Sequence, residues 1–501
     1  MRLLLLGLDC GLTVTKAVVH DAEGNELGRA EARVPQATPH ARWVERDPDK
    51  LWRACAVVIR DAIAAAGAAA ADIAAVGATG HGDGVYLVDS RGAAARPAIL
   101  SMDTRAVGVV DRWRAAGIMP RALELTGQAP WPAAPAAVLA WLAEHEPAVL
   151  ERAEHALGCK DYVKLRLTGA VSTDPTEASQ SFTDVRTQAY SPAALELYGL
   201  DGLGRLLPPV VSSAEVAGTV TVAAARETGL REGTPVVSGI HDVDACAIAT
   251  GVVRPGRLSV VAGSFSINQC ISDAPAVDPR WSCRSFGFPG RWMNMAVSPA
   301  SATNLEWFAR TLVPGDASSF EFVEADVASV AADPREVWYL PFLYGSPVSD
   351  RASGSFVGLR GWHRRGHLVR ALLEGVVFNH RMHVDALRSA FPALAEVRLT
   401  GGGSRSAAWV QMFADALGLP VVLTATVEAG ALGAAMCAGI GAGVYADLDD
   451  AASHVVRERL VVEPMDGGSE DLTRGYERYL DLVRALGPFW DEVGNPIPAN
   501  A

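Results

Sequence analysis

The sequence LLLLGLDCGLTVTKAVVH (residues 3–20) decides the fold. Two apolar runs, each long enough for a strand, flank the small and polar residues 9–13, which fit a tight turn. A second turn at residues 22–25 leads to the alternating run 26–34. Three short strands joined by tight turns form an antiparallel meander. The N-terminus therefore predicts a three-stranded antiparallel sheet.

A helix and two further strands follow this meander. Asp47 and Pro48 are typical of a helix start, and the apolar residues after them repeat about every 3.6 positions. This pattern predicts a helix that covers the sheet. A strand that looks buried at residues 73–78 and a shorter one at 85–88 come next. Strands that alternate with helices indicate an α/β fold.

A similar pattern recurs in the second half of the chain. Residues 257–271 predict a strand, a glycine turn and a second strand, as at the N-terminus. A chain of 501 residues has room for two to four domains of about 150 residues each. The repeat narrows this number to two. We expect an N-terminal domain of residues 1–250 and a C-terminal domain of residues 251–501, whose last ~50 residues form peripheral helices.

The same periodicities predict the other main elements. One of them, a helix over residues 430–438, is so rich in glycine and alanine that it must pack closely against another element. The remaining predictions are strands at 233–239, 397–400 and 420–423, and helices at 242–250, 366–391 and 407–417.

The composition excludes several classes of protein. Half of the residues are apolar and 20% are charged, which is typical of a packed chain. The net charge is −13 and no basic stripe is visible, so we expect no nucleic-acid partner. No apolar stretch approaches the ~20 residues that span a bilayer, and Asp9 interrupts the apolar N-terminus too early for a signal peptide. We expect a cytoplasmic protein without a membrane partner.

The cysteine and histidine patterns do not predict a metal site or disulfides. The seven cysteines are widely spaced and form no C-x-x-C pair, so we expect buried thiols. Two histidine pairs, His363/His367 and His380/His383, have helical spacing, but no H-E-x-x-H motif accompanies them. We expect all four histidines at polar positions on helix surfaces.

Three glycine-containing turns stand at predicted strand ends, at residues 9–13, 262–264 and 401–404. Small residues at such ends let backbone N–H groups approach an anion closely. The first turn adds the hydroxyl of Thr13 and the cation of Lys16. One such turn is usually only a turn, but three of them favour a phosphate-bearing ligand held between two lobes.

Three other motifs that bind nucleotides or hydrolyse esters are absent. No lysine follows a glycine, so the chain has no P-loop. The glycine turn that begins at Gly401 has Ser406 in place of the third glycine of a dinucleotide fingerprint. The G-x-S-x-G pattern of the α/β-hydrolases is also missing.

Asp242 follows a predicted apolar strand and precedes a predicted helix. A carboxylate at the C-terminal end of a parallel strand can act as general base toward a hydroxyl, or it can simply cap the helix, and the residues alone leave both open. Asp9 also stands at a strand end, where it could carry Mg²⁺ through water. Together with the glycine turns, these two acids suggest metal-assisted phosphoryl transfer.

Four segments, which occur in the family's order, resemble motifs of the FGGY carbohydrate kinases: residues 7–16, 239–242, 354–374 and 401–415. This family has the fold of actin, hexokinase and Hsp70, which is ribonuclease H-like. Three positions depart from the family pattern. Leu12 and Ser264 stand where threonine is usual, and Leu372 fits the C-terminal signature poorly. The resemblance implies a two-domain α/β fold with a catalytic cleft between the domains, and an ATP-dependent sugar kinase.

The resemblance also implies roles for individual residues. Asp242 would remove the proton of the sugar hydroxyl as its oxygen attacks the γ-phosphate of ATP, and Asp244 is the second candidate for this base. Asp9 and Asp242 would hold Mg²⁺. The residues implied to line ATP are, for the phosphates, Thr13, Lys16, Gly263 and Ser264, and, for the adenosine, Gly402, Gly403 and Ser406.

The sugar itself is indicated by fewer residues. Family members that act on D-xylulose carry G-Q-M-H-G in the sugar pocket, where this chain has GHGDG at residues 80–84. A carboxylate offers hydroxyl groups a different hydrogen-bond pattern, which argues against D-xylulose. The chain most resembles the branch that acts on L-xylulose or 3-keto-L-gulonate. The residues expected to contact the sugar are Gly82, Asp83, Asp103, Trp131 and Asp242.

Three alternatives stay open at this point. The substrate could be D-xylulose, or a polyol of the erythritol type, because kinases for these compounds share part of the pattern. The chain could also be a nucleotide-binding scaffold that has lost catalysis. A homodimer is compatible with the sequence, which carries no specific signal for it.

Overall fold

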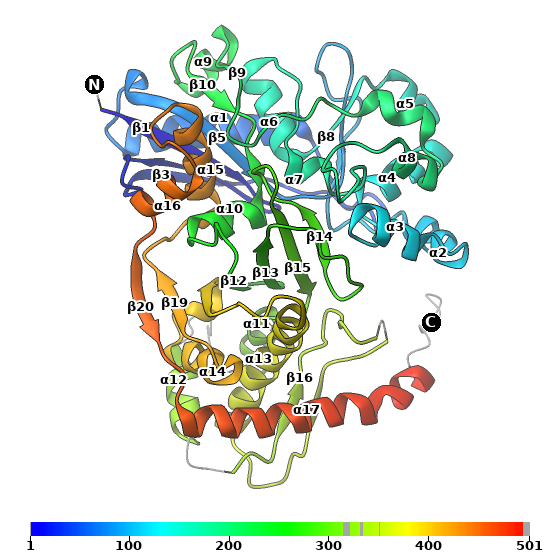
Figure 1. Cartoon of the computed structure of the whole chain (residues 1–501), viewed down its shortest axis with the longest axis vertical. Helices are drawn as coiled ribbons and strands as arrows, with labels where there is room; N and C mark the ends of the chain where they lie inside the picture. Colours follow the sequence, from blue (N-terminus) through cyan, green and yellow to red (C-terminus); the bar gives the residue numbers. More distant parts are fainter. Residues whose placement is uncertain (1, 314–320, 331–333, 350, 494–501) are drawn as a thin grey trace. The chain divides into compact units, whose positions relative to one another are not determined.

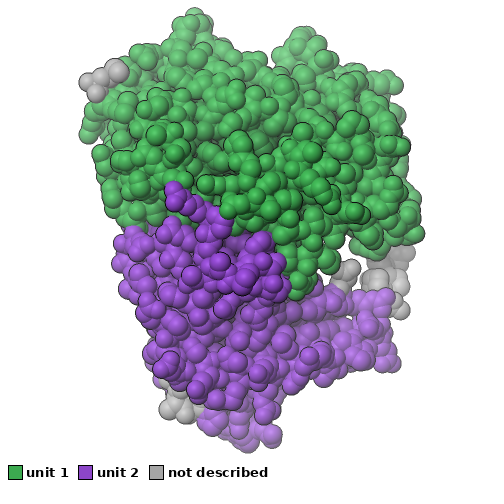
Figure 2. All heavy atoms as spheres, in the orientation of Figure 1, with its two compact units in different colours: residues 1–253, 271–294, 426–457 green, residues 254–270, 295–425, 458–501 purple. Residues whose placement is uncertain are grey.

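The computed structural model of the chain describes residues 2–313, 321–330, 334–349 and 351–493. It divides into two compact units, which Figure 2 distinguishes by colour. Unit 1 consists of Met1–Val253, Ile271–Asn294 and Thr426–Arg457, and unit 2 of Arg254–Cys270, Met295–Ala425 and Glu458–Ala501. Unit 1 thus adds two later segments to the N-terminal part, while the domain boundary at residue 250 stays a prediction.

Unit 1 is built on one mixed sheet, whose strands are, in spatial order, β3 (Glu26–Arg33), β2 (Val14–His20), β1 (Leu4–Cys10), β5 (Ile73–Gly80), β10 (Pro235–Val237) and β9 (Val216–Thr219), with β11 (Ile240–His241) also beside β5. β1, β2 and β3 pair antiparallel, which confirms the predicted meander. β5 runs parallel to β1, and β11 runs parallel to β5.

Of the strand predicted at residues 233–239, only β10 (Pro235–Val237) forms, and a second short strand, β11 (Ile240–His241), follows it. Gly239 separates them and has a φ of 83°, in the left-handed region that glycine adopts without strain. A Cβ at this position would lie 2.1 Å from the carbonyl oxygen of Ala78. The chain therefore bends at Gly239, and β11 ends directly before Asp242.

Alternate residues of β1 face two different helices. Leu6 belongs to the apolar core that α1 (Pro48–Ala65) forms with the sheet. Gly7 faces α15 (Ala429–Gly441), because a Cβ on Gly7 would lie 1.8 Å from the carbonyl oxygen of Ala431. Figure 1 shows α15, in orange, beside β1 and β5. This contact confirms the close packing that the glycine- and alanine-rich composition of the helix predicts.

We expect Gly7→Ala to lower the free energy of unfolding by about 1–3 kcal/mol, because the added methyl group overlaps a backbone carbonyl that cannot rotate away. Thermal unfolding followed by circular dichroism measures this change. The control is Gly202→Ala, since a Cβ on Gly202 meets no atom within 4 Å. Equal melting temperatures for the two variants would rule out the close packing of α15 on β1.

A second apolar core in unit 1 lies among helices. It includes residues of α2 (Val107–Ala115), α3 (Ile118–Thr126), α4 (Pro135–His145), α5 (Pro147–Arg152) and α8 (Pro192–Tyr198). The other helices of this unit are α6 (Cys159–Thr168), α7 (Pro175–Ala178), α9 (Val222–Thr228), α10 (Asp242–Ala249) and α16 (Leu448–Val455).

Unit 2 repeats the strand arrangement that opens unit 1. β12 (Arg257–Ala262) pairs antiparallel with β13 (Ser266–Ser272) and parallel with β18 (Glu396–Thr400), as β1 does with β2 and β5. β19 (Val421–Thr424) and β20 (Glu458–Val462) follow beyond β18. The structure thus confirms the predicted strand–turn–strand repeat.

The helices of unit 2 include α11 (Thr303–Leu312), α12 (Glu321–Ala328), α13 (Arg365–Ala390), α14 (Ala407–Leu417) and α17 (Asp466–Val493). The prediction that the histidines lie on helix surfaces is wrong for His380 and His383 of α13, which are buried. His380 Nδ1 lies 2.8 Å from Asn268 Oδ1, and His383 Nε2 lies 3.0 Å from Ser298 Oγ. Both are therefore hydrogen-bonded core histidines.

All seven cysteines are free thiols, and only Cys246 is not fully buried. This finding confirms the expectation of buried thiols for six of the seven cysteines. Among the helices in the described part of the chain, none has the length and apolar character needed to cross a membrane.

Candidate active site

The carboxyl ends of three parallel strands meet at one edge of the unit 1 sheet. In the register of the strands, Thr79 of β5 lies beside Asp9 of β1 and beside Ile240 of β11. This register brings Asp9, the loop that begins at Gly80, and Asp242 to the same edge. In α/β proteins such an edge is the usual place of a ligand site.

Asp9 carries the first carboxylate of this edge and lies opposite Lys16 in the β1–β2 hairpin. Loss of solvent, and then the nearby Asp242 carboxylate, raise the pKa of Asp9 to about 7, although Lys16 acts in the opposite direction. A Cβ on Gly430 would lie 2.5 Å from Asp9 Oδ2, so the start of α15 is packed directly against this carboxylate. The repulsion between Asp9 and Asp242 favours a cation beside them.

Lys16, predicted to hold phosphates, forms an ion pair with Glu428. Its Nζ donates to Glu428 Oε2 at 2.8 Å, and Arg29 approaches the other oxygen of Glu428 at 3.4 Å. Glu428 precedes α15 and was not predicted as a site residue, because nothing near it in the sequence marks a ligand. The Lys16 ammonium has three donors and its side chain is 30% exposed, so it can also bind a phosphate while it keeps this ion pair.

The turn between β1 and β2 is held from its carbonyl side. Arg46 donates to the carbonyl oxygens of Gly11 and Leu12, and Gln36 Nε2 donates to that of Leu12 at 2.6 Å. Thr13 in the same turn is exposed. Because these side chains already bind the carbonyl oxygens, the turn can offer an anion its backbone N–H groups and the Thr13 hydroxyl.

Asp242 is the first residue of α10, whose N-cap is His241. Its carboxylate is 35% exposed, and Oδ1 lies 3.4 Å from His241 Nε2. Loss of solvent raises the pKa of Asp242 above its ordinary value, although His241 opposes the shift. A raised pKa makes the ionised carboxylate a stronger proton acceptor.

Asp244, the second candidate for the base, is enclosed by protein. Its side chain is only 2% exposed, and Oδ2 lies 3.3 Å from His241 Nδ1. Burial raises the pKa of Asp244 to about 7. A general base must reach the hydroxyl that it deprotonates, so the exposure of the two carboxylates favours Asp242.

Asp83 joins this edge from the loop after β5. The side chain of Trp131, which is 43% exposed, acts on the Asp83 carboxylate and lowers its pKa. Loss of solvent raises the pKa of Asp83 to about 6, against the effects of Arg284 and Trp131. A Cβ on Gly82 would lie 2.0 Å from His241 Nε2, so this loop touches the residue before Asp242. The structure thus brings Gly82, Asp83, Trp131 and Asp242 together.

Arg284 is a residue of this edge that was not predicted from the sequence. It lies on β14 (Ser282–Ser285), is only 4% exposed and acts electrostatically on Asp83, Asp242 and Asp244. A single arginine about 40 residues beyond Asp242 carries no motif. Other charged residues, such as Arg280 and Arg291, stand near it in the sequence, so its charge does not indicate a site.

The geometry favours a structural role for Asp103 over the predicted contact with a sugar. The Asp103 carboxylate is fully buried and accepts hydrogen bonds from the Arg105 side chain at 2.7–3.0 Å. The backbone N–H of Val44 also donates to Asp103 Oδ2, at 2.6 Å. Both carboxylate oxygens are therefore engaged by the protein.

In unit 2, two of the predicted glycine turns lie against each other. β12 and β18 are parallel, so the turn with Gly263 and Ser264 follows one strand and the turn with Gly402 and Gly403 follows its neighbour. A Cβ on Gly403 would lie 2.7 Å from the Cβ of Ala262, which only glycine avoids. The first of these turns was predicted to bind the phosphates of ATP, and the second was predicted to border its adenosine.

Ser406, predicted to border the adenosine, uses its hydroxyl within the protein. Ser406 is the N-cap of α14, and its Oγ accepts from the N–H of Trp409 at 3.1 Å and donates to Glu324 at 2.6 Å. The side chain is almost fully buried. Ser406 can therefore shape the turn before α14, but its hydroxyl is already engaged.

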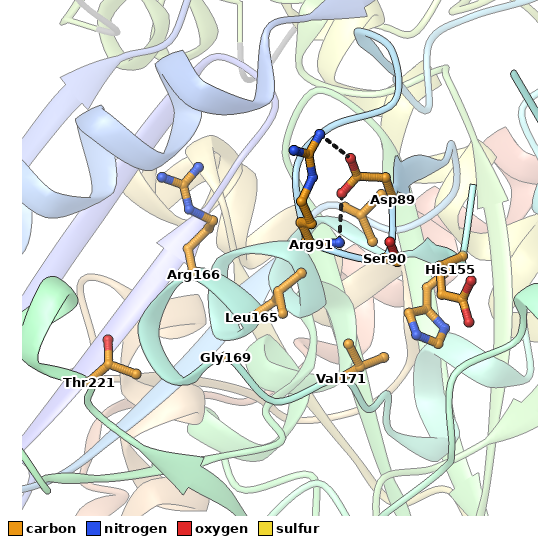
Figure 3. Close-up of a pocket in the computed structure, with 12 residues that line it drawn as sticks. Asp89, Ser90, Arg91, His155, Leu165, Arg166, Gly169, Val171 and Thr221 are labelled. Carbon is orange, nitrogen blue, oxygen red and sulfur yellow. Dashed lines mark hydrogen bonds and ion pairs between the residues drawn. The ribbon is translucent and has the colours of Figure 1, made fainter. Parts of the chain in front are cut away.

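A separate cavity of about 350 Å³ in unit 1 does not contain these residues. Figure 3 shows it with Arg91 turned toward Asp89, and the Arg91 N–H donates to Asp89 Oδ1 at 2.9 Å. His155 and Arg166 also line it. Since none of its lining residues is a predicted site residue, the candidate active site remains the strand edge with Asp9, Asp83 and Asp242.

Comparison with known proteins agrees with this arrangement. Residues 4–249 match the N-terminal domain of the FGGY family of carbohydrate kinases, and residues 261–442 match its C-terminal domain. The chain therefore belongs to this family and is a sugar kinase with the actin- and hexokinase-like fold. Membership implies ATP as the phosphate donor.

Among the relatives, L-xylulose/3-keto-L-gulonate kinase of Escherichia coli (strain K12) is 34% identical over 492 residues, which are 97% of each chain. Erythritol kinase of Brucella abortus (strain 2308) is 31% identical and covers 98% of each chain. Among solved structures, xylulose kinase from Rhodospirillum rubrum is 31% identical, with a TM-score of 0.88, over 97% of this chain and 100% of the other.

Proposed function

We propose that this kinase transfers the γ-phosphate of ATP to a hydroxyl group of a ketopentose-type sugar, L-xylulose or 3-keto-L-gulonate. The observation that carries the reaction is the gathering of Asp9, Asp83 and Asp242 at one strand edge of unit 1. The similarity over the whole chain to the Escherichia coli L-xylulose/3-keto-L-gulonate kinase supports the substrate.

Asp242 is the proposed general base. As the sugar oxygen attacks the γ-phosphorus, the bond from that phosphorus to the β,γ-bridging oxygen breaks, ADP leaves, and the hydroxyl proton passes to the Asp242 carboxylate. The exposure of Asp242 and its raised pKa support this role. On the protein side, Asp242 contacts the ring of His241, whose other nitrogen contacts the buried Asp244.

Mg²⁺ is the proposed metal, with Asp9 and Asp242 as the residues that would hold it. The donor set fits, because Mg²⁺ prefers oxygen ligands and is usually bound through one or two carboxylates together with substrate phosphates. Among the described residues, no group of three acidic, histidine or cysteine side chains forms a complete metal site, so phosphate oxygens and water must supply the other ligands. When bound, Mg²⁺ neutralises charge on the phosphates.

The proposed ATP contacts come from both units. Thr13 and Lys16 of the first hairpin and Gly263 and Ser264 of unit 2 would bind the phosphates. The turn with Gly402, Gly403 and Ser406 would border the adenosine, Ser406 through its backbone. The catalytic cleft between the domains stays a prediction.

The proposed sugar contacts are Gly82, Asp83 and Trp131, with Asp242 at the reacting hydroxyl. The Asp83 carboxylate can accept hydrogen bonds from two hydroxyl groups, and the exposed face of Trp131 can cover the apolar face of a sugar. Asp103 is left out, because Arg105 and Val44 already use both of its oxygens.

A coupled assay of ADP release tests the substrate. We expect kcat/KM to be highest for L-xylulose or 3-keto-L-gulonate, and at least about tenfold lower for D-xylulose and erythritol, because a site built for one hydroxyl pattern leaves buried polar groups unpaired with another. The main alternative substrate is erythritol, because one relative is the erythritol kinase of Brucella abortus. A higher kcat/KM for erythritol or for D-xylulose would refute the substrate assignment. ATP binding without turnover of any compound would indicate a scaffold instead.

A location in the cytoplasm, where ATP is supplied, completes the proposal. The homodimer stays a prediction.

A further inference from the structure

Gln180 connects the proposed sugar loop to a buried part of unit 1. It follows α7, is only 3% exposed, and accepts the backbone N–H of Asp83 on its Oε1 at 2.5 Å. Its Nε2 donates to Glu177 Oε2 at 2.6 Å. The side-chain amide of Gln180 is therefore fixed at both ends.

The backbone at Asp83 needs such support. Its φ is 56°, a left-handed conformation that residues other than glycine rarely adopt. Gly84 beside it is also left-handed, and a Cβ there would lie 2.2 Å from the carbonyl oxygen of Ile99. The loop is thus tightly bent at two successive residues, and the hydrogen bond from Asp83 N–H to Gln180 stabilises this bend.

The direction of the Asp83 carboxylate depends on this bend. Arg284, Trp131 and Asp242 all act on the pKa of this carboxylate. Gln180 holds the backbone N–H of Asp83, while the Asp83 carboxylate lies within electrostatic reach of Arg284 and Asp242 of the strand edge. A change in the backbone at Asp83 would redirect the carboxylate away from them.

The segment that carries Gln180, residues 174–180, is tightly packed. A Cβ on Gly158 would lie 2.9 Å from Glu177 Oε2, so the chain passes close to the Glu177 carboxylate. Three residues before Glu177, Asp174 forms an ion pair with Lys160, in which Lys160 Nζ lies 2.9 Å from Asp174 Oδ1. Neither of these two side chains is exposed to solvent. Residues 174–180 are therefore anchored in a buried charged network.

We propose that Gln180 is a positioning residue for sugar recognition. It acts through Asp83, because it holds the left-handed backbone that aims the Asp83 carboxylate at the sugar hydroxyl groups. The inference rests on the proposed function, in which Asp83 binds the sugar, and it adds the residue that sets the direction of that contact.

The first test is Gln180→Ala, with sugar and ATP kinetics measured separately. We expect the KM for the sugar to rise about tenfold or more, and the KM for ATP to stay within about twofold, since the lost hydrogen bond supports only the sugar loop. The matched control is Gln188→Ala. Gln188 also accepts a backbone N–H, from Gly290 at 3.1 Å, and donates to a carbonyl, that of Arg291 at 2.8 Å.

The second test separates positioning from a general effect on folding. If Gln180 acts through Asp83, the double variant Gln180→Ala/Asp83→Asn will have the same sugar KM as Asp83→Asn alone. Multiplied effects would mean that Gln180 acts independently of Asp83, which overturns the inference. Gln180→Met, which keeps the length of the side chain and removes both hydrogen bonds, replaces the alanine variant if that variant does not fold.

These outcomes distinguish the inference from the proposed function. A raised sugar KM in Asp83→Asn with a normal sugar KM in Gln180→Ala or Gln180→Met rejects the role of Gln180 alone. An unchanged sugar KM in Asp83→Asn rejects the sugar contact of Asp83, and the inference with it.

Discussion

Replacing Asp242 by asparagine is expected to lower kcat by about 10²- to 10⁴-fold, the effect typical of losing a positioned acid–base group. Asparagine keeps the shape of the side chain but cannot take the proton of the sugar hydroxyl. The exposed position of Asp242 at the end of β11 is the structural reason for expecting this loss. Steady-state kinetics measure kcat, and titration calorimetry checks that ATP still binds with little change.

Asp244→Asn is the matched comparison for this prediction. Asp244 is the same residue type two positions on, but its carboxylate is buried against His241. We therefore expect a smaller loss of kcat in Asp244→Asn than in Asp242→Asn. The reverse order, with near-normal turnover in Asp242→Asn, would make Asp244 the base.

Replacing Asp83 by asparagine is expected to raise the KM for the sugar by about 10- to 100-fold, because hydrogen bonds to a charged group are the stronger ones and the amide can accept fewer of them. The KM for ATP should change by less than about twofold, since Asp83 is proposed to contact only the sugar. Initial rates measured over a grid of sugar and ATP concentrations give both constants.

Asp89→Asn is the control for this prediction. Asp89 lines the separate cavity in unit 1 and accepts backbone N–H groups within its own turn. Its substitution should leave both KM values unchanged. If Asp83→Asn raised the two KM values equally, Asp83 would not be a sugar contact.

Much of the fold could be predicted because its signals are local. The alternating run after His20 and the turn at residues 9–13 are sufficient for the meander, and the recurrence at residues 257–271 is sufficient for the repeat. The glycine- and alanine-rich segment predicted close packing but not its partner, which is the face of β1 that carries Gly7. The partner depends on contacts about 420 residues apart, which no periodicity encodes.

The errors in the fold have the same origin. His380 and His383 were predicted at a helix surface because they are polar, but they lie on the buried face of α13, where serine and asparagine side chains satisfy them. The short strand β11 after Gly239 was not predicted as a separate element, because the apolar pattern does not show that the backbone turns at Gly239 and pairs again beyond it.

The candidate site was predictable where a residue stands at a strand end. Asp9 and Asp242 follow apolar runs directly, so their shared edge follows from the parallel sheet. Arg284, Glu428 and Gln180 have no such signal, since each reaches the edge from a different part of the chain.

The structure also shows what a sequence does not reveal about residues that look available for a ligand. Asp103 and Ser406 have the right chemistry for sugar and nucleotide contacts, but protein groups already use the Asp103 carboxylate and the Ser406 hydroxyl. A sequence shows which groups are polar, whereas only the structure shows which of them are already satisfied.

The most direct test of the central claim is to identify the product. The wild-type protein, incubated with ATP, Mg²⁺ and L-xylulose or 3-keto-L-gulonate, should form one sugar phosphate for each ADP released, as measured by mass spectrometry and the coupled assay. The Asp242→Asn variant should form almost none under the same conditions. ADP release without a sugar phosphate, or sugar phosphate formed equally well by the variant, would contradict phosphoryl transfer to the sugar with Asp242 as its base.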